Sequence, residues 1–191
     1  MPARPTARRK LLDVAAALFY REGVGAIGVD RISAEAGVSK RSLYQHFASK
    51  DALVAAALAD FGPAILERYV PVDDDDATSP RQKILGAFDA LGNWSRTPDF
   101  RGCPFLNVST ELADPHHPAR AVARDYKLRL LRYFTHQARI GHADRPETLA
   151  EQLLMVFDGA ISRAVMNCAP VPGSARAAAE ILLDAHGLSA D

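Results

Sequence analysis

Helix start signals recur along this chain of 191 residues and limit the folds that it can adopt. Ser79 is followed by Pro80 and Gln82, a capping box with proline at the first helical position. Similar starts occur at Cys103-Pro104, at His117-Pro118, at Asp144 with Pro146 and Glu147, and at Ser174. The alternation of polar and apolar residues that marks half-buried strands is nearly absent. The sequence therefore predicts an all-α fold.

Caps, apolar periodicity and stop signals such as Gly23 and Gly25 delimit nine expected helices. Their ranges are 6–22, 29–36, 39–47, 50–69, 79–96, 103–113, 117–140, 144–167 and 174–187. The helices before Lys50 differ in scale from the longer ones after it, which predicts two domains, residues 1–50 and 51–191. The acidic run Asp73–Asp76 lacks the spaced ligands and the turn glycine of a calcium loop, so we expect a solvated linker.

The formal net charge of zero hides a division along the chain. Residues 1–50 contain 9 Lys/Arg and 4 Asp/Glu, a net charge of +5, whereas the remainder contains 14 and 19, a net charge of −5. A basic segment joined to an acidic body indicates that the first fifty residues meet a polyanion.

Two expected short helices joined at Gly37 are typical of a DNA-binding helix-turn-helix, although an ordinary helical hairpin can share this turn. In the second of them, Leu43 and Phe47 lie on one face and Arg41 and Gln45 point away from it. Arg and Gln can pair bidentately with guanine and adenine edges in the major groove. The exposed face therefore favours DNA binding over a plain hairpin.

The candidate phosphate contacts around Arg41 and Gln45 are Lys40, Tyr44, His46 and Lys50, because contacts to the DNA backbone position a protein on the duplex. Ser42 lies on a flank of the same helix. Lys50 also begins a helix, whose amino end carries partial positive charge. The predicted DNA-binding set is Lys40, Arg41, Ser42, Tyr44, Gln45, His46 and Lys50.

The segment Leu11–Leu53, and most clearly Gly28–Leu53 (GVDRISAEAGVSKRSLYQHFASKDAL), resembles the DNA-binding signature of the TetR family of tetracycline-repressor-like regulators. The resemblance implies a nine-helix architecture with a three-helix DNA-binding domain and a larger ligand-binding and dimerisation domain. It further implies a homodimeric repressor that binds double-stranded operator DNA and is released by a small-molecule effector. Many members carry Thr or Ser before the second helix, whereas Ile27-Gly28 here removes one side-chain phosphate contact.

The resemblance also implies that the last two helices pair with their copies in a dimer. An apolar stripe on the expected helix 144–167, together with one residue of the last helix, is the candidate interface. These residues are Leu149, Leu153, Val156, Ala160, Ala164 and Ile181. The alternative is that such a stripe forms the core of a single chain.

Aromatic residues in the middle helices suggest a pocket for an apolar or aromatic effector, although aromatic residues at helical spacing also form ordinary core. The candidates are Trp94, Phe105 and Phe134, with Asn107 or Asp158 as the polar contact. A carboxylate within an apolar helix needs a partner, which singles out Asp158.

Cys103 offers a second possible input. The segment Gly102–Asn107 with Glu111 resembles a stretch in a subset of TetR-type regulators, in some of which the cysteine senses electrophiles or oxidants. A thiol at a helix N-terminus has a lowered pKa. Cys103 is thus either a sensor and part of the effector pocket or an inert residue at a cap position.

Other classes of protein find little support. The sequence lacks a nucleophile elbow, a phosphate loop and a dinucleotide fingerprint, and His116-His117 with Glu111 lack further metal ligands at matching spacing. We therefore expect no catalytic residue, cofactor or metal, and an enzyme on a helical scaffold is a remote alternative. An architectural DNA-binding protein would not need so long a C-terminal region.

Two cysteines and the absence of a membrane-length apolar stretch predict a cytoplasmic protein.

Overall fold

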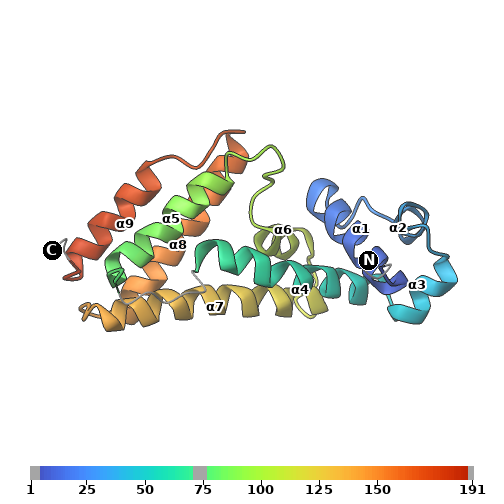
Figure 1. The fold of residues 1–191 in the computed structure, drawn as a ribbon, viewed down its shortest axis with the longest axis horizontal. Helices are drawn as coiled ribbons and strands as arrows, with labels where there is room; N and C mark the ends of the chain where they lie inside the picture. The colour runs from blue at the N-terminus through green and yellow to red at the C-terminus, as the bar shows by residue number, and fades with distance from the viewer. Residues whose placement is uncertain (1–4, 71–76, 189–191) are drawn as a thin grey trace. The chain divides into compact units, whose positions relative to one another are not determined.

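The computed structural model describes residues 5–70 and 77–188, and every regular element in these ranges is a helix (Figure 1). The all-α prediction is confirmed, with nine α-helices in the described ranges. They are α1 (Ala7–Glu22), α2 (Val29–Ala36), α3 (Lys40–His46), α4 (Lys50–Tyr69), α5 (Pro80–Trp94), α6 (Pro104–Glu111), α7 (Pro118–Ile140), α8 (Pro146–Met166) and α9 (Ser174–Ala185). The acidic run Asp73–Asp76 lies outside the described residues. No helix in the described part is long and apolar enough to cross a membrane.

The chain divides into two compact units that are not continuous in sequence. The first comprises Met1–Pro63 and Cys103–Tyr126, and the second comprises Ala64–Gly102 and Lys127–Asp191. The first unit therefore contains α1 to α3, α6, the beginning of α4 and the beginning of α7. Residues 103–126 belong to the same unit as the helix-turn-helix, although they are distant from it in sequence.

Polar caps begin several helices as the sequence predicts. The Ser39 hydroxyl accepts a hydrogen bond from the Ser42 amide at 3.1 Å, and the Ser49 hydroxyl accepts one from Ala52 at 3.0 Å. Ser79 forms the complete capping box with Gln82. Nδ1 of His117 accepts a hydrogen bond from the Ala119 amide at 3.1 Å, which caps α7. Each cap satisfies an amide that the first helical turn leaves without a partner.

The start of α8 differs from the prediction. The cap position is Arg145, with a φ of +55° and no side-chain cap bond, rather than Asp144. The backbone of Asp144 is instead occupied, because its amide donates to the His186 carbonyl at 2.9 Å and its carbonyl contacts the His186 ring. A contact between segments 42 residues apart thus overrides the local cap.

The start of α9 also differs by one residue. Gly173 takes the cap position, and its carbonyl accepts a hydrogen bond from the Ala177 amide at 3.1 Å. Ser174 is therefore the first helical residue and makes no cap bond.

In the first unit, α1 packs against α2 and α3. Leu11, Ala15 and Leu18 of α1 are fully buried, as are Ile32 of α2 and Leu43 of α3. The spacing of the α1 residues places them on one face of the helix, which produces a small three-helix core.

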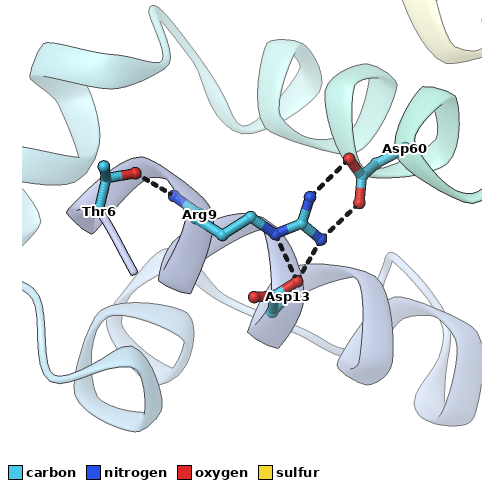
Figure 2. Close-up of polar contacts among 4 residues, drawn as sticks. All are labelled: Thr6, Arg9, Asp13 and Asp60. Carbon is cyan, nitrogen blue, oxygen red and sulfur yellow. Dashed lines mark hydrogen bonds and ion pairs between the residues drawn. The ribbon is translucent and has the colours of Figure 1, made fainter. Parts of the chain in front are cut away.

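Arg9 connects α1 to α4 within this unit (Figure 2). Its guanidinium donates to both carboxylate oxygens of Asp60, at 2.8 and 2.7 Å, and also to Asp13. The hydrogen bonds to Asp13 and to Asp60, in this order of effect, raise the pKa of Arg9 above its ordinary value. The forked guanidinium geometry gives the contact a defined direction. One cation of the basic segment is thus committed to holding the helices together.

In the second unit, α9 packs against both α5 and α8 (Figure 1). The same unit contains an aromatic core in which Phe157 makes edge contacts with Tyr69 and Phe88, at ring-centroid distances of 5.0 and 5.3 Å. Phe134 is stacked against Phe88 at 6.3 Å. Aromatic residues of α4, α5, α7 and α8 therefore meet in one cluster, and such contacts are favourable beyond the area that they bury.

Candidate DNA-binding surface

The turn between α2 and α3 has the geometry that a helix-turn-helix requires. Gly37 adopts a φ of +62°, which a residue without a Cβ atom reaches without strain. The Gly37 amide donates to the Ala34 carbonyl at 3.2 Å, and the Val38 amide donates to the Ser33 carbonyl at 3.0 Å. These bonds close the end of α2, and Ser39 immediately caps α3.

The two faces of α3 have different roles. Leu43 and the following Phe47 are buried in the core of the first unit. Arg41 and Gln45 are exposed on the opposite side, and the Tyr44 ring is about half exposed. The outer face therefore presents the two side-chain types that can contact base edges directly.

Ion pairs distinguish the basic residues around α3. Lys40 pairs with Asp30 at 2.8 Å, and this hydrogen bond raises the pKa of Lys40. Arg31 pairs with Glu22 at 2.6 Å and with Glu35 at 2.8 Å. In the described part of the chain, no ion pair engages Arg41. Unlike Lys40, Arg41 would therefore not have to break an ion pair before it could bind DNA.

Two further basic residues have contacts that the sequence did not indicate. The Nζ atom of Lys50 donates to the Val24 carbonyl at 2.7 Å, in a partly buried position at the start of α4. The Arg8 guanidinium lies over the Phe47 ring, 5.4 Å from its centre. Lys50 therefore has a structural contact in addition to the predicted phosphate contact.

The residues predicted for an effector pocket are distributed over both units. Cys103, Phe105 and Asn107 lie in the first unit, whereas Trp94, Phe134 and Asp158 lie in the second. Phe105 is stacked on Tyr126 at a centroid distance of 3.7 Å. Asp158 has the partner that its position requires, because its carboxylate forms an ion pair with Lys127.

The predicted dimer residues lie mostly inside the chain. Leu149, Leu153, Ala160 and Ala164 are buried within the single chain, and Val156 is half-buried. These positions agree with the alternative interpretation of the stripe as core. Ile181 is 68% exposed.

The exposed side of α8 has an apolar surface that the sequence analysis did not select. Met155 is 65% exposed and Met166 is 79% exposed. Gly159 and Ser162 lie between them, at the spacing of one helix face. A Cβ atom on Gly159 would have no neighbour within 4 Å. A hydrophobicity pattern identifies the core face of a helix first, so this weaker second stripe was missed.

Replacing Ser39 by Ala should lower the free energy of unfolding by about 1 kcal/mol, because the first turn of α3 loses its cap. Urea unfolding measured by circular dichroism tests this expectation. Ser174→Ala is the matched control, since Ser174 makes no cap bond, and its effect should stay within about 0.5 kcal/mol. Equal losses in the two variants would contradict the role of Ser39.

Comparisons with known proteins agree with this geometry. Residues 11–57 match the model of the bacterial regulatory proteins of the TetR family. The transcriptional repressor KstR2 of Mycolicibacterium smegmatis is 41% identical over 90 residues, which are 47% of this chain and 43% of that protein. The chain thus spans less than half the length of this relative.

Solved structures extend the similarity to more than nine-tenths of the chain. A TetR-type transcriptional regulator from Streptomyces avermitilis is 43% identical, with a TM-score of 0.90 over 95% of this chain and 98% of its own. A TetR-family regulator from Streptomyces coelicolor is 28% identical, with a TM-score of 0.84 over 94% and 95% of the two chains. These relatives are described as transcriptional regulators and not as enzymes. The chain belongs to the TetR family of bacterial regulatory proteins.

Proposed function

We propose that this protein is a repressor that binds double-stranded operator DNA in the cytoplasm with α3 in the major groove. The observation that carries the proposal is the outer face of α3, where Arg41 and Gln45 are exposed while Leu43 and Phe47 anchor the helix. The repressor named among the relatives supports the direction of regulation.

The residues of the helix-turn-helix divide the work of binding. Arg41 and Gln45 contact base edges, because their side chains can make paired hydrogen bonds to guanine and adenine. The surrounding polar residues contact phosphates and fix the register on the duplex. These are Lys40, Ser42, Tyr44, His46 and Lys50.

Operator binding requires two copies of the chain, because one reading head covers only a half-site. We place the two-fold interface on the exposed faces of α8 and α9. Met155, Gly159 and Met166 supply the α8 side, and Ile181 supplies the α9 side. Exposed apolar residues on two adjacent helices are typical of a surface that a partner covers.

A small apolar or aromatic effector releases the DNA in this proposal. Trp94 is the aromatic candidate best suited to report it, since the ring is only half-buried and contacts Phe100 at 4.9 Å. Phe134 is fully buried and packs against Phe88 in the aromatic core of the second unit. Sensing through the Cys103 thiol is not favoured, because this residue is only 3% exposed.

A footprint on the DNA upstream of the protein's own gene tests the proposal. We expect one protected site with two-fold symmetry, bound far more tightly than unrelated DNA. A screen of apolar compounds under reducing conditions should then find one that releases this DNA and quenches Trp94 fluorescence, with Cys103→Ser unaffected. Failure to select any specific site from total genomic fragments would contradict operator binding. Loss of the response in Cys103→Ser alone would instead establish thiol sensing.

A further inference from the structure

The turn that follows α1 is held by a carboxylate from α6. One oxygen of Glu111 accepts a hydrogen bond from the Val24 amide at 2.9 Å, and the other accepts one from the Gly25 amide at 2.5 Å. Two consecutive backbone amides that converge on one anion form a concave binding site. Here the anion is a side chain 86 residues further along the chain.

The sequence of the turn suits this contact. Gly23 has a φ of +89°, and a Cβ atom added there would lie 3.1 Å from Oε1 of Glu111. A Cβ atom on Gly25 would also lie 3.1 Å from the same oxygen. The two glycines that end α1 therefore also allow the carboxylate to approach the backbone closely.

The same turn is held from the opposite side by α4. The Val24 carbonyl accepts the hydrogen bond from Nζ of Lys50 at 2.7 Å, and the Val24 side chain is buried. The Val24 amide thus donates to the Glu111 carboxylate, while the Val24 carbonyl accepts from the Lys50 ammonium group. No ion pair joins Glu111 to Lys50 in the described ranges, so their connection passes through the turn.

The supporting end of α6 is itself anchored within the first unit. The Arg120 guanidinium donates to the carbonyls of Ser109 and Leu112, both at 2.7 Å, which satisfies the end of the helix. Nε2 of His117 lies 3.3 Å from the Asp51 carboxylate at the start of α4. A carboxylate on the last residue of a helix opposes the helix dipole. Glu111 therefore does not stabilise α6 through the helix dipole, and its hydrogen bonds to the turn after α1 explain its position better.

We propose that Glu111 is a positioning residue for DNA binding. Glu111 and Lys50 together clamp the α1–α2 turn, and through Glu111 the helix α6 helps to position the DNA-binding helices. The inference rests on the proposed operator binding.

Replacing Glu111 by Ala in the full chain tests the clamp in the absence of DNA. We expect hydrogen exchange at the Val24 and Gly25 amides, measured by NMR, to accelerate at least about tenfold, because both amides lose a charge-assisted bond. Glu111→Gln retains one acceptor and should give an intermediate rate. Gly25→Ala, which crowds the same oxygen without backbone strain, should accelerate exchange in the same direction. Unchanged exchange at both amides would overturn the clamp.

Operator affinity tests the positioning role. Glu111→Ala should weaken operator binding about tenfold, which corresponds to one such hydrogen bond, while the salt dependence stays unchanged because no phosphate contact is lost. The matched control is Glu147→Gln in the second unit, whose carboxylate pairs with Arg139. It should leave affinity and exchange unaltered. Faster exchange with unchanged affinity would overturn the positioning role, whereas a wild-type protein that binds no DNA would contradict the operator proposal itself.

A double-mutant cycle between Glu111→Ala and Lys50→Met examines the two sides of the clamp together. Once either side is lost the turn is already free, so the double variant should lose less affinity than the product of the two single losses. Fully multiplicative losses would show that Glu111 and Lys50 act separately and would overturn the two-sided clamp.

Discussion

Met155→Glu combined with Ile181→Glu should convert the protein to monomers that bind a palindromic operator at least about 100-fold more weakly, since linkage of two half-sites contributes 10² or more in affinity. Both side chains are more than half exposed in the single chain. Their replacement therefore leaves the core intact. In a two-fold interface, however, each substitution is present in both copies, so every added carboxylate would be buried without a partner.

Light scattering after gel filtration gives the mass of the double variant, and fluorescence anisotropy gives its operator affinity. Leu128→Glu combined with Ile140→Glu is the matched control, because these α7 residues are also exposed apolar side chains of the second unit. The control should remain dimeric and bind normally. A dimeric Met155→Glu/Ile181→Glu protein would show that the interface lies on another surface.

The residues predicted for a dimer interface illustrate what periodicity in a sequence can and cannot reveal. The stripe that contains Leu149, Leu153 and Ala160 is the most regular apolar pattern on α8, and it faces the chain's own core. A surface that a second copy covers needs only a few exposed apolar residues such as Met155 and Met166. Periodicity ranks the first stripe above the second because every helix must have a core face, whereas an interface is optional.

Most of the fold could be predicted because its signals are local. Ser39, Ser49, Ser79 and His117 cap helices at the positions that the sequence indicates. The prediction was wrong at Asp144, whose backbone is engaged by His186. Local sequence carries no information on such a contact between distant segments.

The candidate site could be predicted in part for the same reason. The faces of α3 follow from a helical wheel, because Leu43 has to be buried in the three-helix core. The contact of Glu111 with the α1–α2 turn could not be predicted, since its partners Val24 and Gly25 are 86 or more residues away. The two glycines and the charged residue were visible in the sequence, but nothing in their spacing connects them.

The ion pairs in the structure show which cations of the basic segment 1–50 have a carboxylate partner. Arg9, Arg31 and Lys40 each form ion pairs with carboxylates of the same unit. The net charge of +5 for residues 1–50 already counts Asp13, Glu22, Asp30 and Glu35, so among these partners only Asp60 of α4 lowers the positive charge further. Arg9, Arg31 and Lys40 thus have carboxylate partners, whereas Arg41 is exposed and forms no ion pair in the described part of the chain.

Arg41→Ala should reduce operator affinity by about 10- to 100-fold, which corresponds to the loss of one bidentate contact to a base pair. Binding to unrelated DNA should change much less, because non-specific binding depends on phosphate contacts. The specificity ratio should therefore fall, and base preference should be lost at one position of each half-site. Anisotropy titrations on the operator, on operators substituted at each position and on unrelated DNA measure all three effects.

The neighbouring Lys40 provides the matched comparison for Arg41. Lys40→Ala removes a cation that is already paired with Asp30, so it should weaken binding to operator and unrelated DNA by a similar, smaller factor. Lys50→Ala should also act on all sequences alike, and it should reduce the salt slope by about one because it removes the proposed phosphate contact. A uniform loss in Arg41→Ala together with altered base preference in Lys40→Ala or Lys50→Ala would reverse the roles proposed for these residues. Base recognition would then lie at the edges of α3 rather than on its central face.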